Sequence, residues 1–251
     1  MTAPHPAGPA AAREAILGRI REALRVAAPP PHLGPHAGGT ATGHADAATG
    51  PGSLAILPAE AARPWLPDGG ESPADHLRIL TENLGKLRAV VHRAADLPAA
   101  AAFVAALAAE RGWRRVACHA HPQVDAVVGG LPCESLPVDA GRFDKNALEA
   151  CDAGVTACEV LVAQTGSILV SSASCGGRAL SILPHVHVVV AGLDQIVATL
   201  GDAFAAVRQR HAGRLPSMLS FITGPSRTGD IERILVLGAH GPKELFVVLV
   251  G

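Results

Sequence analysis

The sequence predicts an α/β domain built on a mainly parallel β-sheet. A chain of 251 residues, 49% of them hydrophobic, can bury a large core and form one such domain with some additional material. Strand-like runs at residues 88–92 and 114–118 flank a helix-like segment. A strand–helix–strand unit of this length makes parallel strands joined by a right-handed crossover. Further β-branched runs at residues 186–191 and 245–250 supply more strands.

The first elements of this domain have clear start and stop signals. Ser72 is a suitable N-cap for a helix with Pro73 at its first position, and Gly85 suits its C-terminal cap. Asp96 begins the helix of the strand–helix–strand unit, and Gly112 ends it. Residues 145–151 are predicted to form a helical turn that leads into an extended segment.

The second half is predicted to alternate in the same way. Residues 157–171 are expected to run from a short helix into a strand, with a bend at residues 165–167. Apolar residues from Leu193 to Val207 recur at helical spacing, with arginines in the last turn, and predict a long helix. A short helix is predicted at residues 230–237 by Ile231, Ile234 and Leu235.

The N-terminal quarter differs from the rest in composition. Residues 1–27 are predicted to contain an amphipathic helix, over 11–27, with an apolar stripe and arginines around it. Residues 28–70 are predicted to form a linker or extended segment, richest in Pro, Gly and His up to residue 52. The α/β domain then spans residues 71–251.

Charge and composition argue against several classes of function. The 21 Lys and Arg residues nearly balance 22 Asp and Glu, and aromatic residues make up 3% of the chain. A nucleic-acid footprint needs clustered basic residues, and base stacking needs aromatic ones. No apolar run approaches the roughly 20 residues of a membrane span, and residues 1–8 do not resemble a secretory signal. We therefore expect a cytoplasmic protein that binds no nucleic acid and has no membrane span.

Neither cysteines nor histidines predict a cofactor in this chain. No two of the five cysteines form Cys-x2-Cys, the spacing typical of iron–sulfur clusters and zinc ribbons. Their odd number is typical of reduced, mostly buried thiols. The linker histidines with Asp46 leave metal binding open, as do His119 and His121, but a solvated linker and a surface loop fit these patterns better. We expect no metal, iron, haem or flavin in the purified chain.

Two polar bends are the candidate functional stretches. Each follows or precedes an apolar strand-like run, and each combines glycine with hydroxyl side chains, which favours a site for a small anionic ligand. The candidate ligand-binding residues are Thr165, Gly166, Ser167, Gly224, Pro225, Ser226, Arg227, Thr228 and His240. We expect the two bends to meet at one end of the parallel sheet. The alternative is purely structural: Ser226 and Thr228 cap the next helix, and Asp230 pairs with Arg227.

Several of these stretches together resemble one known family. The segments AQTGSI at 163–168, LPHVH at 183–187, TGPSRTGDIE at 223–232 and GAHGP at 238–242 resemble the lactate utilization protein C family, which carries a LUD domain. The resemblance covers roughly residues 74–251, and the last two segments are long and specific. Ser167 stands where the family often has a second threonine, which is a conservative departure.

The resemblance implies a fold and two alternative functions. The implied fold is a three-layer α/β/α sandwich similar to the sugar-isomerase and CoA-transferase superfamily. The implied role is a subunit, without a redox centre, of a cytosolic system that oxidises L-lactate to pyruvate with iron–sulfur clusters in separate partner subunits. The alternative is a stand-alone enzyme for a phosphorylated or CoA-type ligand, with Glu159 or Asp230 as base or nucleophile. Fold similarity to isomerases and transferases is analogy only.

Overall fold

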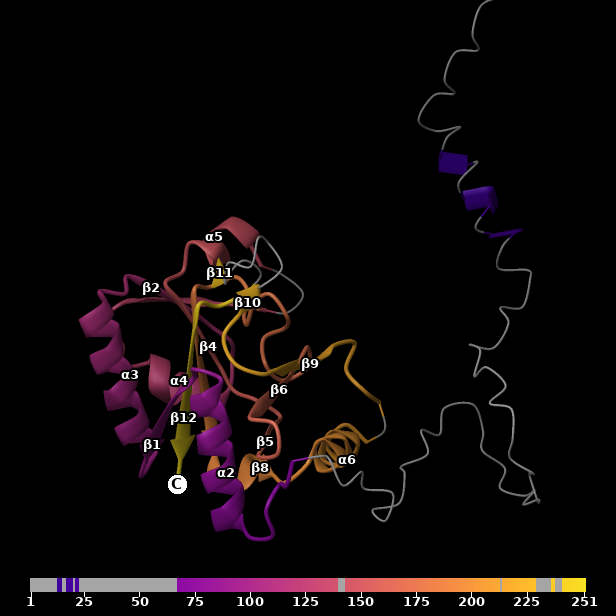
Figure 1. Ribbon diagram of the computed structural model, residues 1–251. Helices are drawn as coiled ribbons and strands as arrows, with labels where there is room; N and C mark the ends of the chain where they lie inside the picture. The colour runs from indigo at the N-terminus through magenta and orange to yellow at the C-terminus, as the bar shows by residue number, and fades with distance from the viewer. Residues whose placement is uncertain are drawn as a thin grey trace, which may run out of the picture. The chain divides into compact units, whose positions relative to one another are not determined.

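The computed structural model describes residues 13–14, 17–19, 21–22, 67–139, 143–212, 214–228, 236–237 and 241–251 (Figure 1). The chain divides into two compact units, Met1–Ala55 and Ile56–Gly251. All the described residues of the first unit are helical, as predicted, and the Arg21 guanidinium lies 2.9 Å from the Glu14 carboxylate. The predicted linker lies outside the described residues except for its last four.

A six-stranded parallel sheet forms the centre of the second unit. Its order is β1-β12-β7-β4-β2-β3, and every neighbouring pair is parallel. The strands are β1 (Val90–Ala94), β2 (Arg115–Cys118), β3 (Glu134–Pro137), β4 (Ala153–Thr156), β7 (Val186–Gly192) and β12 (Glu244–Val250). The parallel sheet predicted from the β-branched runs is therefore confirmed.

The helices around this sheet are α2 (Pro73–Lys86), α3 (Leu97–Arg111), α4 (Pro122–Val128) and α5 (Lys145–Glu149). Ser72 and Asp96 cap α2 and α3 as predicted, each accepting a backbone N–H with its side chain. Gly112 ends α3 in the left-handed conformation. The predicted end of α2 at Gly85 is wrong: the helix continues to Lys86, and Leu87 is its C-cap.

Two apolar cores, one on each face of the sheet, create three layers. On one face, α3 and α4 pack through Val104, Val124 and similar residues against the even-numbered valines of β7. On the other face, Leu80 and Leu84 of α2 pack with residues of a second, smaller sheet against the odd-numbered residues of β7 and β12. The alternation follows from the twofold repeat of side chains along a strand. The outer layer on this second face thus contains a sheet as well as helices.

The smaller sheet has four strands in the order β8-β5-β6-β9. They are β5 (Val160–Val162), β6 (Ser167–Ser171), β8 (Ile196–Val197) and β9 (Leu219–Ile222), and β6 pairs antiparallel with both β5 and β9. The short helix predicted after residue 157 is therefore wrong. Val160 and Val162 favour an extended backbone, and Gly166, at φ 65°, turns the chain back into β6.

The helix predicted from Leu193 to Val207 is shorter than its periodicity suggests. A 3-10 turn, η2 (Leu193–Gln195), and strand β8 precede α6 (Leu200–Arg210). Thr199 and Asp202 form a capping box that begins α6, and Ile196 and Val197 pair with β5 instead. Ala203 and Val207 of α6 pack on the outer face of the small sheet.

The segment after β9 is described only in part. Strand β10 (Arg227–Thr228) pairs antiparallel with β11 (Val236–Leu237). The helix predicted at residues 230–237 is wrong at its last two residues, which are extended, and residues 230–235 lie outside the described part of the chain.

Candidate functional site

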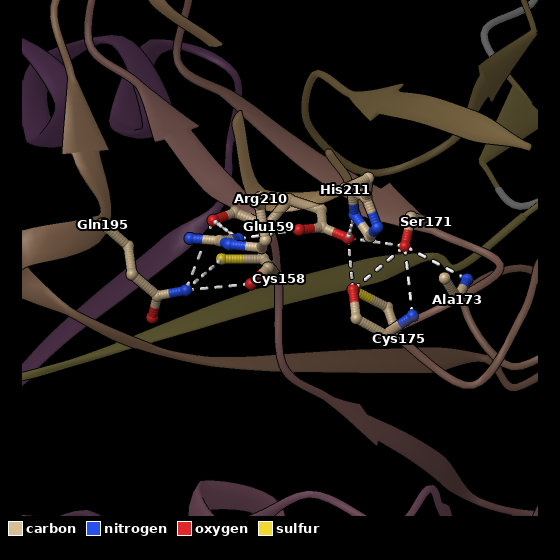
Figure 2. Close-up of polar contacts among 9 residues, drawn as sticks. Cys158, Glu159, Ser171, Ala173, Cys175, Gln195, Arg210 and His211 are labelled. Carbon is tan, nitrogen blue, oxygen red and sulfur yellow. Dashed lines mark hydrogen bonds and ion pairs between the residues drawn. The ribbon is translucent and has the colours of Figure 1, made fainter. Parts of the chain in front are cut away.

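A buried carboxylate, Glu159, is the centre of the densest polar cluster in the described structure (Figure 2). It precedes β5, and its partners come from the end of β6, the loop after it and the end of α6. Its Oε1 accepts hydrogen bonds from the hydroxyls of Ser171, at 2.6 Å, and Ser174, and lies 3.0 Å from His211 Nε2. Its Oε2 accepts from Arg210 at 2.7 Å, and the same guanidinium nitrogen donates to the Glu159 backbone carbonyl.

These hydrogen bonds decide the charge of Glu159. Burial alone raises the pKa of a carboxyl group, because the charged form loses its hydration. Here hydrogen bonds from Ser171, Ser174, Arg210 and His211 outweigh burial and lower the pKa of Glu159 to about 2. The side chain is fully buried and ionised at neutral pH.

The geometry favours a structural role for Glu159 over the predicted role as a base or nucleophile. A general base needs a free lone pair and a pKa near the working pH. Both oxygens of Glu159 already accept strong hydrogen bonds, and its pKa is far below neutrality. The carboxylate instead ties the β5–β6 hairpin to the end of α6. The other candidate base, Asp230, lies outside the described residues.

A second polar cluster is a line of three hydroxyl groups that runs from the turn between β5 and β6 to the residue after β9. The Thr165 hydroxyl is hydrogen-bonded to that of Ser167 at 2.7 Å, and Ser167 to Thr223 at 2.8 Å. Ser167 is buried, whereas Thr165 is half-buried and Thr223 is exposed. A hydroxyl can donate a hydrogen bond, and the oxygens of a carboxylate or phosphate accept one, so the chemistry of the exposed end suits the predicted anionic ligand.

The structure places the first predicted bend beside the start of the second. Thr223, which contacts Ser167, directly precedes Gly224, Pro225 and Ser226. The predicted reason for their meeting is wrong: the bends lie in the small sheet, where β6 and β9 pair antiparallel, and not at an edge of the parallel sheet. The Ser226 N–H donates to the Pro242 carbonyl, which holds the Gly224-Pro225 corner against residues 241–242. Ligand binding here stays a prediction.

Other members of the predicted set are only partly described. The backbones of Arg227 and Thr228 form β10, while their side chains and all of His240 lie outside the description. Pro225 is buried, and Ser226 is half-buried. Sequence reasoning missed Ser171 and Ser174 as partners of Glu159, and also Arg210 and His211. Contacts across 12 to 52 positions of sequence leave no local signal, although a lone glutamate in an apolar run indicates a buried charge that needs partners.

Gly166 allows a test of how the first bend is held. Its φ is 65°, and an added Cβ would lie 2.9 Å from the Asn83 Cβ of α2. We expect Gly166→Ala to lower the free energy of unfolding by about 2–4 kcal/mol, because both backbone strain and a steric clash arise. Denaturant titration measures this free energy.

Gly85→Ala is the matched control: its Cβ would meet no atom within 4 Å, and it should be neutral or stabilising by up to about 1 kcal/mol. Equal effects of the two substitutions on the free energy of unfolding would contradict the close contact between Gly166 and α2.

His119 and Ala157 lie where the strand order of the parallel sheet reverses. β2 leads to β3 on one side, and β4 leads towards β7 on the other, the place where open α/β sheets often bind ligands. His119 Nε2 accepts the Ala157 N–H at 3.1 Å, and the loop at Gly176 packs against its ring. His119 is buried, so its predicted place in a surface loop is wrong, and His121 is the N-cap of α4. The imidazole of His119 therefore lies at this position, hydrogen-bonded to the backbone of Ala157.

Other ligand sites find little support in the described part of the chain. It contains no group of three His, Cys, Asp or Glu side chains placed to hold a metal ion. In a hollow at the amino ends of β2, β3 and β4, Arg115 is paired with Glu134, and Asp152 accepts hydrogen bonds from two backbone N–H groups. The residues that line this hollow are Arg114, Arg115, Glu134, Ala150 and Asp152. No described helix is both long and apolar enough to cross a membrane.

Known proteins resemble part of this chain. It is 36% identical over 103 residues to a lactate utilization protein C of Shouchella clausii and 34% identical over 123 residues to that of Bacillus subtilis. It is 36% identical over 132 residues to one of Deinococcus radiodurans. These matches cover 41%, 48% and 50% of this chain, and they span 45%, 51% and 61% of the relatives, about half their length.

A crystal structure of a DUF162 family protein from Deinococcus radiodurans has the same fold. It aligns with a TM-score of 0.56 at 29% identity, over 72% of this chain and 100% of that one. The family model of the LUD domain matches residues 77–250, which include every strand of both larger sheets. This chain therefore belongs to the LUD domain family.

Proposed function

We propose that this chain is a subunit of a cytoplasmic system that oxidises L-lactate to pyruvate and that it carries no redox centre of its own. The observation that supports this most is its 31–36% identity to relatives named lactate utilization protein C. The oxidation removes two electrons and two protons from lactate. In this proposal, iron–sulfur subunits on separate chains accept the electrons, in keeping with the lack of Cys-x2-Cys spacing in the sequence.

The proposed role of the second polar cluster is to hold a small anion such as the carboxylate of lactate or pyruvate. Thr223 and Thr165 offer hydroxyls near the Gly224-Pro225 corner, and Gly224, at φ 89°, keeps the backbone there accessible without a side chain. Arg227 follows two residues later and would supply the charge-assisted contact that a carboxylate prefers. Anion binding by the hydroxyls and arginine together is the substrate-handling function that we propose.

Co-purification tests the proposed subunit role. The chain would be tagged in its native host and isolated from cells grown on L-lactate, and the isolated material analysed for iron and for its protein components. We expect iron-containing partner chains to be retained and the chain alone to lack lactate-oxidising activity. Turnover of a phosphorylated or CoA-type compound by the isolated chain, with no partner retained, would favour the stand-alone enzyme instead.

Replacing Arg227 by alanine tests the proposed anion site. A charge-assisted hydrogen bond contributes about 1.5–3 kcal/mol, so Arg227→Ala should weaken lactate-dependent activity of the assembled system by about 10- to 150-fold. Arg214→Ala is the control, because Arg214 is an exposed arginine just before β9. Loss of folding in Arg227→Ala would show a structural ion pair, and unchanged activity would place the site elsewhere.

A further inference from the structure

We propose that strand β9 is an interface through which two copies of this chain join their small sheets into one continuous sheet. This interface goes beyond the proposed function and does not depend on it. Strand β9 forms one edge of the four-stranded sheet, and no described residue pairs with its outer side (Figure 1). The proposal follows from three properties of this edge: its lack of protection, the direction of its backbone groups and the aromatic residues beside it.

The other edges of the two larger sheets are protected against pairing. Exposed edge strands are usually protected by charge, proline or short length. β1 carries an exposed arginine, Arg93, whereas β3 carries Glu134 and ends in Pro137, and β8 has only two residues. β9 has four residues with neither charge nor proline, and the whole stretch from Pro216 to Pro225 is uncharged. Among the described residues no strand pairs with the outer side of β9, and the strand has no charge that would repel a partner strand.

The outward backbone groups of β9 belong to alternate residues. The Met218 carbonyl accepts the N–H of Ser172, which follows β6, so residue 218 faces β6. In an antiparallel ladder this alternation directs the backbone groups of Ser220 and Ile222 to β6 and those of Leu219 and Phe221 outward. An extended strand is the partner that satisfies such a row of N–H and C=O groups.

A second copy of β9 fits this row by its own symmetry. If two β9 strands run antiparallel with Phe221 opposite its counterpart, Leu219 lies opposite Thr223 of the other copy. Leu219, Phe221 and Thr223 all have outward backbone groups in this arrangement. Each opposing pair of residues can therefore exchange backbone hydrogen bonds. Because the strand is uncharged, no like charges meet across the twofold axis. Thr223 is also the exposed end of the hydroxyl line, so the interface would adjoin the proposed anion site.

Aromatic residues beside the strand supply the apolar contact. Phe204 of α6 packs edge-to-face on Phe221, with ring centroids 5.5 Å apart, yet it is 48% exposed. Leu215, which leads into β9, is 51% exposed. In the proposed dimer, Phe204 and Phe221 of both copies meet on the α6 side of the joined sheet, which removes this apolar surface from water.

Light scattering after size exclusion, over a range of concentrations, tests the proposal. The wild-type chain of 25.5 kDa should elute as a dimer of about twice that mass. Phe204→Glu and Ser220→Lys should each raise the dissociation constant at least about tenfold, because one places carboxylates at the axis and the other adds the lysine typical of protected edges. Phe143→Glu is the matched control, with a phenylalanine that is 46% exposed elsewhere, and should leave the dimer intact.

Amide hydrogen exchange distinguishes strand pairing from other contacts. The amides of Leu219 and Phe221 should be protected only at concentrations where the dimer forms, whereas those of Ser220 and Ile222 should be protected at all concentrations. A wild-type monomer at about 100 μM, or a dimer unaffected by both β9-side variants, would overturn the proposal. Protection of Leu219 and Phe221 in the monomer would overturn it too, since the chain itself would then cover this edge.

Discussion

Replacing Glu159 by alanine is expected to lower the free energy of unfolding by about 3–5 kcal/mol. The fall in the pKa of this carboxyl from 4.5 to about 2 corresponds to about 3 kcal/mol of net stabilisation of the ionised form, after the cost of burial. The substitution also leaves the buried hydroxyl of Ser171 without its acceptor. Arg210 is half-exposed and can regain water, which limits the loss from that side. Equilibrium denaturation at pH 7.5 measures the change.

The control for this substitution is a glutamate without buried partners. Glu149 lies exposed at the end of α5, and Glu149→Gln should change the free energy of unfolding by less than about 0.5 kcal/mol. If Glu159→Ala were as mild as the control, the cluster around Glu159 would not hold the hairpin to α6. If it kept its stability but lost lactate-dependent activity, Glu159 would act in the chemistry after all.

The parallel sheet could be predicted because its signals are local. Continuous β-branched runs form β7 and β12, and caps at Ser72, Asp96 and Gly112 fix helix ends through contacts within three or four residues. Such local signals can be recognised in a single sequence without any knowledge of tertiary contacts. They also explain why the predicted strand–helix–strand unit matches β1, α3 and β2 to within two residues.

The small sheet and the Glu159 cluster could not be predicted in the same way. Ile196 and Val197 continue a helical pattern, and only their pairing with β5, some 35 residues earlier, makes them a strand. Tertiary pairing thus overrides local periodicity. Two members of the hydroxyl line, Thr165 and Ser167, belong to the predicted site, but the third, Thr223, is joined to Ser167 by the β6–β9 pairing. Residues so far apart meet through sheet topology, which no single stretch of sequence encodes.

Two buried histidines are expected to make stability fall as the pH drops from 7.5 to 5. Burial lowers the pKa of both His119 and His187 from 6.5 to about 4. His187 Nε2 is hydrogen-bonded to Thr156, and its Nδ1 has no partner among the described residues, so protonation would bury an unpaired charge. His119 Nε2 accepts a backbone N–H, so protonation would break that bond.

The sign of the effect follows from proton uptake by the unfolded chain. At pH 7.5, one unit above the unfolded-state pKa of 6.5, both histidines are mostly neutral in both states. As the pH falls towards 4 the unfolded state binds protons that the folded state excludes, and the folded state is progressively disfavoured. At pH 5 the cost is about 2 kcal/mol per histidine, or about 4 kcal/mol for the pair. Glu159 adds nothing in this window, because its contribution is lost only as the pH falls from about 4.5 towards 2.

Denaturant titrations at pH 7.5 and 5 of the wild type and three variants separate these contributions. His187→Gln and His119→Gln each keep a polar group and remove one titrating ring, so each should reduce the pH-dependent loss by about half. His185→Gln is the control, because the ring of His185 is exposed, and it should leave the loss unchanged. A wild-type stability that is equal at both pH values would mean that water reaches these rings in the folded state. A loss that persists in the double variant His119→Gln/His187→Gln would assign the pH dependence to other groups.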